Sequence, residues 1–271
     1  MRKDASNIIT LTTDFGLTDP YVGIMKGVIL SINPEASITD ISHGIAPGSI
    51  TEASAILLEA VPFFPAGTIH LVVVDPGVGG KRRPIIIEAR GHLFVGPDNG
   101  VLLPAAQSLG KISIRAITKR KYTLPAVSST FHGRDIFAPA AAHLSIGASP
   151  LDFGEPVDDP VVSEPAVPEK TGEQLHGAAV RVDRFGNIIT DIKEDMLKGF
   201  LRGKRPVLRI GPTEIQGLSK TYCDVEKGKP LALIGSSGFL EISVNQGRAS
   251  DLPGVEKKEA HDIKVSIRRH I

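Results

Sequence analysis

Residues 69–87 read I-H-L-V-V-V-D-P-G-V-G-G-K-R-R-P-I-I-I. A run of apolar, mostly β-branched residues ends abruptly at Asp75, and Pro76 and three glycines separate it from a second apolar run. This pattern predicts a buried strand that presents a carboxylate at the edge of a sheet and then turns sharply. Arg82 and Arg83 close the turn. Because a carboxylate at the end of a buried strand is costly unless it is paired or used, Asp75 is a candidate functional residue.

Strand and helix patterns alternate on both sides of this stretch. Apolar residues at helical spacing follow Asp19-Pro20, where Asp19 is an expected N-cap, and a second helix follows Ser49, which forms an S-x-x-E capping box with Glu52. Strand patterns occur at 8–13, 37–42, 85–89, 92–95 and 113–118. The βαβ series predicts a mostly parallel sheet with helices on both faces, in an N-terminal α/β domain of residues 1–148.

The character of the sequence changes after residue 148. Residues 149–175 are rich in proline and acidic residues and show little periodicity, which is typical of a linker. From residue 176 to 271, short alternating runs are separated by turn residues, with almost no helical pattern. We therefore expect an α/β protein with a second, all-β barrel-like domain at the C-terminus.

Composition excludes several classes of partner. Lys and Arg number 31 and Asp and Glu number 30, so no global charge attracts nucleic acid or an anionic membrane. No apolar run reaches the roughly eighteen residues that a membrane-spanning helix needs. The single cysteine, Cys223, forms no intrachain disulfide and suits a reducing compartment. We expect a soluble, cytoplasmic protein that recognises a small molecule through a local pocket.

The motif T-F-H-G-R-D at residues 130–135 is the expected partner of Asp75, because it places His132 among polar residues before a helix. A single histidine in this position is as often a hydrogen-bonding residue as a catalyst. Arg134 and Asp135 can simply pair with each other. The other seven histidines show no metal-ligand spacing, so we expect no metal site. The glycines after Asp75 lead into a strand and not a helix, which excludes a dinucleotide fingerprint.

Asp14 follows the first expected strand. The carboxyl ends of strands are where open α/β sheets bind ligands, and a carboxylate there commonly binds ribose hydroxyls. In the second domain, the turns at 183–187 and 235–238 are either plain hairpin turns or binding sites for the amino and carboxylate groups of an amino acid.

Seven motifs in order resemble the S-adenosylmethionine (SAM) hydrolases, or SAM hydroxide adenosyltransferases, the family related to the fluorinase and chlorinase. They are T-T-D-F-G-x-x-D-x-Y-V-G at 12–23, D-I-S-H at 40–43, V-D-P-G-V-G at 74–79, G-P-D-N-G at 96–100, S-T-F-H-G-R-D at 129–135, D-x-F-G-N-I at 183–188 and S-S-G-F-L-E-I at 236–242. The resemblance implies hydrolysis of SAM to adenosine and methionine without a cofactor, in a homotrimer whose subunits share each site.

The resemblance also assigns residues. Asp75, Arg82 and His132 match the family's catalytic set, Asp14 matches the ribose-binding acid, and Thr130 matches a threonine at the reaction centre. In the second domain the SAM-binding positions fall on Asp183, Asn187, Tyr222, Ser236, Ser237 and Glu241, with adenine bound by backbone near Val244.

Departures from the halogenating relatives favour water as the nucleophile. Those enzymes carry Tyr where this chain has Asp75, Ser at Gly133 and Trp at Gly48, and they insert a loop that is absent here between Ala89 and Phe94. Expulsion of a neutral thioether needs no acid, so the site must supply an oriented water and a group that accepts its proton.

Two other classes of function stay open from the residues alone. A metal-dependent phosphoesterase could use the loop acids and two histidines, a set that comprises Asp14, Asp40, Asp75, Asp98, His43 and His132. A non-catalytic SAM or adenosine sensor would bind the same ligand without turnover.

Overall fold

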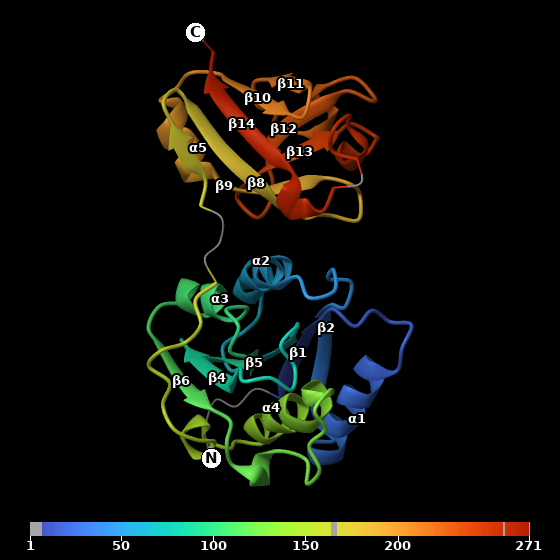
Figure 1. Cartoon of the computed structure of the whole chain (residues 1–271), viewed down its shortest axis with the longest axis vertical. Coiled ribbons are helices and arrows are strands. Elements are labelled where there is room, and N and C mark those ends of the chain that lie inside the picture. Colours follow the sequence, from blue (N-terminus) through green and yellow to red (C-terminus); the bar gives the residue numbers. More distant parts are fainter. Residues whose placement is uncertain (1–6, 164–166, 257, 271) are drawn as a thin grey trace. The chain divides into compact units, whose positions relative to one another are not determined.

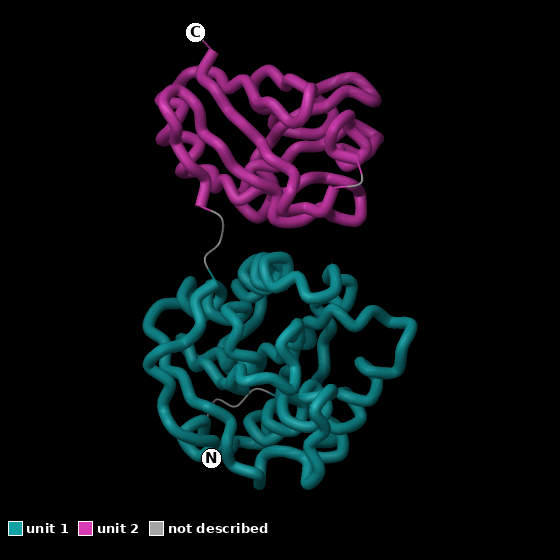
Figure 2. Tube along the Cα trace, viewed as in Figure 1, with its two compact units in different colours: residues 1–163 teal, residues 164–271 magenta. Residues whose placement is uncertain are grey.

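The structure, a computed structural model, describes residues 7–163, 167–256 and 258–270. It contains two compact units, residues 1–163 and residues 164–271 (Figure 2). Unit 1 is an α/β domain and unit 2 is built almost entirely of antiparallel strands (Figure 1). The fold class expected from the sequence is confirmed.

Unit 1 holds a six-stranded sheet in the order β2-β1-β3-β5-β4-β6. Strands β2, β1, β3 and β5 are parallel, and β4 is antiparallel to both of its neighbours. The strands are β1 (Ile8–Thr13), β2 (Ser37–Ser42), β3 (Ile69–Val73), β4 (Pro84–Ala89), β5 (His92–Pro97) and β6 (Ile112–Ala116). The helices are α1 (Tyr21–Ile32), α2 (Ile50–Ala60), α3 (Leu103–Ser108) and α4 (Ala138–Ser145).

Helices cover both faces of this sheet, and the alternation of side chains along β3 shows why. Leu71 and Val73 join the core cluster that contains residues of α1 and α4, whereas Val72 and Val74 join the cluster that contains residues of α2 and α3. A strand whose residues are apolar on both sides needs cover on both faces. The continuous apolar run before Asp75 is therefore the centre of the domain.

The expected N-cap of α1 is shifted by one residue, and that of α2 is at the expected residue without the expected capping box. The first helical hydrogen bond of α1 runs from Ile24 N to Pro20 O, so Pro20 takes the N-cap position that was expected for Asp19. Ser49 is the N-cap residue of α2 but makes no side-chain cap bond. Its backbone N–H is already bonded to Ala46 O, and Glu52 Oε2 accepts from Ala46 N at 3.0 Å instead. The capping box therefore does not form.

Part of the stretch expected to be a linker packs against unit 1. Pro150–Asp152 form a short 3-10 helix, and Phe153 is fully buried and stacks on Tyr122 at 3.9 Å between ring centroids. Asp159 pairs with Arg83 at 2.6 Å. The burial of Phe153 and the ion pair of Asp159 thus attach this part of the stretch to unit 1. The content of proline and acidic residues alone had predicted an extended linker here.

Unit 2 is an antiparallel, nearly closed barrel-like sheet in the order β11-β10-β14-β8-β9-β13-β12, with β7 paired to β8. Its strands are β7 (Glu169–Thr171), β8 (Gln174–Val182), β9 (Ile188–Lys193), β10 (Pro206–Ile210), β11 (Thr213–Gln216), β12 (Pro230–Ile234), β13 (Phe239–Val244) and β14 (Lys264–Arg269). One helix, α5 (Glu194–Leu201), was not expected, and it buries Leu197, Phe200 and Leu201 in the core of the unit.

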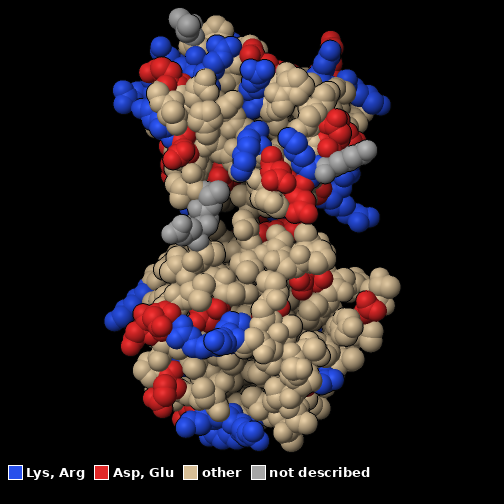
Figure 3. All heavy atoms as spheres, in the orientation of Figure 1, with Lys and Arg blue, Asp and Glu red and all other residues tan. Residues whose placement is uncertain are grey.

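The described part of the chain contains no helix long and apolar enough to span a membrane. Charged side chains of both signs are interspersed over unit 2, whereas uncharged side chains form much of the drawn face of unit 1 (Figure 3).

A buried histidine pair makes the stability of unit 1 depend on pH. His70 on β3 is fully buried, its Nε2 lies 3.1 Å from His92 Nδ1, and burial lowers its pKa from 6.5 to about 3. Below pH 6.5 the unfolded chain binds a proton that the folded chain does not, so stability falls as the pH falls from 6.5 toward 3. We expect His70 to account for a loss of about 2 kcal/mol between about pH 7 and about pH 5.

Urea unfolding of the wild type and of His70→Gln at the two pH values measures this contribution. The wild type should lose about 2 kcal/mol more unfolding free energy than the variant. Equal losses in the two proteins would contradict the assignment to His70.

Candidate active site

Three polar residues follow parallel strands at one edge of the sheet in unit 1. Asp14 follows β1, Asp75 lies two residues beyond β3, and Asn99 lies two residues beyond β5. Because these strands are neighbours and run in the same direction, their carboxyl ends meet at one edge. The fold therefore gathers side chains from distant parts of the sequence where α/β sheets bind ligands.

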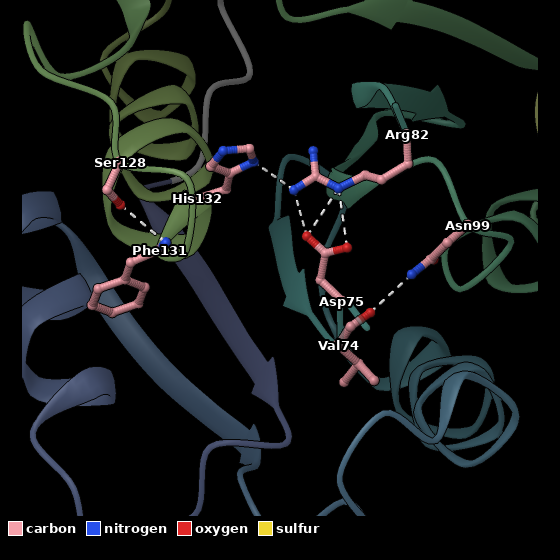
Figure 4. A network of polar contacts seen from close by, with 7 residues as sticks. All are labelled: Val74, Asp75, Arg82, Asn99, Ser128, Phe131 and His132. Atoms are coloured by element: carbon pink, nitrogen blue, oxygen red, sulfur yellow. Dashed lines mark hydrogen bonds and ion pairs between the residues drawn. The ribbon is translucent and has the colours of Figure 1, made fainter. Parts of the chain in front are cut away.

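Asp75, Arg82 and His132 form one connected network (Figure 4). Arg82 Nε donates to Asp75 Oδ1 at 3.0 Å and to Oδ2 at 2.9 Å, and Arg82 Nη2 also donates to Oδ2. The same Nη2 lies 2.6 Å from His132 Nδ1. The Asp75 side chain is 4% exposed and the Arg82 side chain 10% exposed, so water screens the ion pair weakly. Arg82 also stacks over the ring of Phe137 at 5.2 Å.

The contact with Arg82 defines the protonation of His132. A guanidinium has donors and no acceptor, so Nδ1 of His132 must accept and the ring carries its proton on Nε2. Burial lowers the pKa of His132, and the neighbouring positive charge of Arg82 lowers it further. Both observations indicate a neutral imidazole.

A glycine brings the two halves of this network together. Gly79 has φ +75°, and a Cβ at this position would collide with the carbonyl oxygen of Ser129. Only glycine therefore allows the turn after β3 to lie directly against the segment that leads to His132.

A pocket of about 500 Å³ opens beside the network. It is lined by Asp14, Phe15, Tyr21, Pro47, Gly48, Val73, Asp75, Pro76, Val78, Thr130, Phe131, His132 and Gly133. Four of the residues singled out in the sequence (Asp14, Asp75, Thr130 and His132) thus share one pocket, and Arg82 lies behind Asp75. Asp14 Oδ2 accepts from Gly48 N at 2.7 Å, which holds that carboxylate at the pocket.

Sequence reasoning missed the aromatic side of this pocket. The rings of Phe15, Tyr21 and Phe131 contact one another edge to face, with centroid distances of 5.3 to 5.9 Å. All three residues lie in the motifs at 12–23 and 129–135, which is the signal that the sequence offers. The pocket therefore combines carboxylates with an apolar aromatic surface, the combination that suits an organic ligand bearing hydroxyl groups.

In unit 2, the turn at 183–187 joins the antiparallel strands β8 and β9. Asp183 Oδ1 accepts from Phe185 N at 2.8 Å and from Asn187 N at 2.9 Å, and Asn187 Nδ2 donates to Asp183 Oδ2 at 2.9 Å. These bonds fix both polar side chains, while the Phe185 side chain is exposed.

A second polar group in unit 2 surrounds Glu241 on β13. Glu241 is 8% exposed, and its Oε1 accepts from Tyr222 Oη and Ser243 Oγ, each at 2.8 Å. Burial and the adjacent carboxylate raise the pKa of Tyr222 to about 12, so the phenol keeps its proton and donates. A Cβ at Gly235 would lie 2.7 Å from Glu241 Oε2, so the turn that carries Ser236 and Ser237 passes close to this carboxylate. Val244 is the last residue of β13.

The acids that a metal-dependent phosphoesterase would need have other partners. Asp40 pairs with Lys26 at 2.6 Å, and Asp98 pairs with Arg83 at 2.6 Å. Within residues 7–163, 167–256 and 258–270, no group of three or more His, Cys, Asp or Glu side chains is arranged to hold a metal ion.

Two family models together match most of the chain. The N-terminal domain model of the SAM hydroxide adenosyltransferases matches residues 9–154, and the C-terminal domain model matches residues 177–261. The chain belongs to the SAM hydroxide adenosyltransferase family.

Similar proteins agree with this membership in the family. An (R)-S-adenosyl-L-methionine hydrolase from Methanocaldococcus jannaschii is 41% identical, over 94% of this chain and 95% of its own. An (R)-S-adenosyl-L-methionine hydrolase from Salinispora tropica is 39% identical, over 91% of this chain and 94% of its own. A fluorinase from Actinoplanes is more distant, at 27% identity over 90% of this chain and 93% of its own. The crystal structure of an uncharacterized conserved protein from Thermotoga maritima aligns with a TM-score of 0.88 at 39% identity, covering 96% of this chain and all of that one.

Proposed function

We propose that this protein hydrolyses S-adenosyl-L-methionine to adenosine and L-methionine. The observation that carries the proposal is the pocket in unit 1, where Asp75 with Arg82 and His132 faces the same space as Asp14. The similarity to named SAM hydrolases over more than nine-tenths of the chain supports the choice of substrate. A SAM or adenosine sensor would need no carboxylate–guanidinium pair beside its ligand.

The reaction is a displacement at C5′ of the adenosyl group. The oxygen of a water molecule forms a bond to C5′ while the bond from C5′ to the sulfonium sulfur breaks, and the electron pair of that bond stays on methionine. The neutral thioether needs no proton to leave. The water loses one proton, and we assign Asp75 to accept it.

Asp75 is suited to a late proton transfer. Asp75 Oδ2 accepts two hydrogen bonds from Arg82, whereas Oδ1 accepts one and keeps a lone pair for the water. A carboxylate is too weak a base to generate free hydroxide from water, so deprotonation should follow the formation of the C–O bond. The main contribution of the pair is then to hold the water in line with the C–S bond.

His132 is better suited to hold the Arg82 guanidinium in place than to act as a base. Its Nδ1 accepts from Arg82 and its Nε2 carries the proton, so the neutral ring has no unoccupied nitrogen to take a proton from water. Its contact with Arg82 instead fixes the guanidinium that holds Asp75.

We assign Asp14 to the ribose hydroxyls and Thr130 to the lining of the reaction centre. Asp183, Asn187, Tyr222, Ser236, Ser237, Glu241 and the backbone at Val244 are assigned to the amino-acid and adenine parts of SAM. The positions of Asp14 and Thr130 on the pocket in unit 1 and the fixed, polar surroundings of Asn187 and Glu241 in unit 2 support these roles.

Water is the proposed nucleophile in preference to halide. At Gly133, where the halogenating relatives carry Ser, a Cβ would lie 3.1 Å from Met25 Sδ and 3.3 Å from Val73 Cγ1. The packing here thus leaves little room for the hydroxyl that those enzymes use.

Incubation of the pure protein with SAM tests the proposed function. We expect adenosine and methionine in equal amounts, at a rate that EDTA does not change, because the pocket offers a carboxylate and a cation for the water and no group of metal ligands. Chromatography of the nucleoside products measures the outcome. A 5′-chloroadenosine peak in chloride buffer, or loss of activity with EDTA, would contradict the proposal.

We also propose that the active enzyme is a homotrimer in which unit 1 of one subunit and unit 2 of its neighbour complete each site. The support is that the assigned residues are divided between two separate units, each with its own core. Apolar side chains beside both groups are exposed, with Tyr21 44% and Val78 37% exposed at the pocket in unit 1 and Phe185 75% exposed in unit 2. A neighbouring subunit that completes the site would cover these side chains.

A further inference from the structure

The loop G-P-D-N-G, Gly96–Gly100, contains none of the residues assigned to the proposed reaction. It contacts the turn between β3 and β4 that carries Asp75 and Arg82. Its first two residues, Gly96 and Pro97, end β5, which pairs with β3 in the middle of the sheet. Two consecutive residues of this loop, Asp98 and Asn99, contact the two ends of the turn that carries Asp75 and Arg82.

Asn99 holds the first end of the turn. Its Nδ2 donates to the backbone carbonyl of Val74 at 2.9 Å, directly before Asp75 (Figure 4). Its Oδ1 accepts from Val101 N at 3.2 Å, so the side chain is held at both of its polar atoms. Val74 is fully buried, and its carbonyl lies beyond the last residue of β3. The pairing of β3 with β5 ends at Leu71, so the Asn99 amide supplies a hydrogen-bond donor to a backbone carbonyl beyond it.

Asp98 holds the other end. Its backbone N–H donates to Arg83 O at 2.8 Å, and its Oδ2 accepts from Arg83 Nε at 2.8 Å. Its Oδ1 accepts from Val161 N at 2.9 Å. Both carboxylate oxygens of Asp98 therefore accept hydrogen bonds from the protein. The side chain is only 2% exposed, so these bonds are shielded from water. Arg83 is therefore fixed through its backbone and its side chain, and Arg82 is the residue directly before it.

We infer that Asp98 and Asn99 are positioning residues for the Asp75–Arg82 pair. Between the two fixed ends, the turn contains Gly77, Gly79 and Gly80, whose backbone is intrinsically flexible. Without fixed ends, such a turn would let the carboxylate move relative to C5′. The inference rests on the proposed function, because it concerns the geometry of that reaction.

Asn99→Asp is the first test, because it keeps the shape of the side chain and replaces the donor to Val74 O with an acceptor. A misplacement of about 1 Å can cost about 100-fold in rate, so we expect kcat for SAM to fall roughly 10- to 100-fold. The Kd for SAM should stay within about threefold of the wild type, because Asn99 does not line the pocket.

Asn33→Asp is a matched control. Asn33 Nδ2 donates to Ser145 Oγ at 2.8 Å and its Oδ1 accepts from Glu35 N at 3.1 Å, the same pattern of contacts away from the pocket. This variant should lower Tm and keep the wild-type kcat per folded molecule. If Asn99→Asp does the same, the role of Asn99 is only structural and the inference is overturned.

Asp98→Asn provides an independent second variant, and it decides the question if Asn99→Asp does not fold. It keeps one oxygen acceptor and removes the buried charge that binds Arg83, which leaves only the exposed Asp159 paired with Arg83. We expect kcat to fall again while Kd for SAM stays unchanged. Wild-type kcat in this variant would overturn the role of Asp98. A wild type that forms no adenosine would instead refute the proposed function, so the two failures are distinguishable.

Discussion

Replacement of Asp75 with Asn should lower kcat for SAM hydrolysis by about 1,000-fold, within the range of 10²–10⁴ that a positioned general base contributes. The substitution removes the acceptor for the water proton and the charge that orients the water. It keeps the shape of the side chain and one oxygen that accepts from Arg82, whereas the new Nδ2 cannot accept from the guanidinium. The rate is measured as adenosine formed per folded subunit at saturating SAM.

Binding of SAM should change little in Asp75→Asn, because Asp75 is assigned to the water and not to recognition of the ligand. Asp14→Ala is the complementary variant. Loss of a charged hydrogen bond costs about 1.5–3 kcal/mol, which corresponds to a Kd for SAM that is roughly 10- to 100-fold weaker. Calorimetry measures both constants. If Asp75→Asn lost binding and Asp14→Ala kept it, the two roles would be exchanged.

The chemistry at the edge of the sheet could be predicted because it depends on local patterns. The apolar run that ends at Asp75 identified the central strand, and the topology of parallel strands then placed Asp14 and Asp75 at the same edge. Membership in the SAM hydroxide adenosyltransferase family, expected from seven motifs, is confirmed over both units. The roles of the individual site residues stay predictions.

Other features could not be predicted because they depend on contacts between distant segments. Val74 O and Asn99 are 25 positions apart, and nothing in either segment specifies their hydrogen bond. The pairing of His70 with His92 depends on the register of β3 and β5. Helix α5 was missed because eight residues give too little periodicity, although Leu197, Phe200 and Leu201 have helical spacing.

The composition of residues 149–175 did not predict which parts of this stretch pack against the two units. Proline and acidic residues favour an extended chain, and on that basis residues 149–175 were expected to separate two domains. Burial of Phe153 and the ion pair of Asp159 with Arg83 hold the first part of this stretch on unit 1, while Glu169–Thr171 form β7 in unit 2. Residues 153–157 also form backbone hydrogen bonds with residues 114–119, and Val161 N donates to Asp98 Oδ1. These contacts together outweigh the average preference of the segment.

Mixing two inactive variants should restore activity if subunits share each site. Asp75→Asn is defective in unit 1 and Asn187→Ala in unit 2, so a site made from unit 1 of the second variant and unit 2 of the first is intact. In a closed ring of three subunits with random mixing, about one site in four has this composition. Co-refolding the two variants should therefore raise activity from near zero to about a quarter of the wild type.

The control for this experiment is a mixture of Asp75→Asn and Asp14→Ala. Both substitutions lie in unit 1, so no combination of these subunits yields an intact unit 1 and activity should stay near that of the variants alone. Sedimentation shows that trimers are present, and co-purification of an untagged variant with a tagged one verifies that the trimers are mixed. If verified mixed trimers of Asp75→Asn and Asn187→Ala regain nothing, or if an active monomer is found, each site must lie within one chain. Restoration in the first mixture and not in the second follows only from a site that joins unit 1 of one subunit to unit 2 of another.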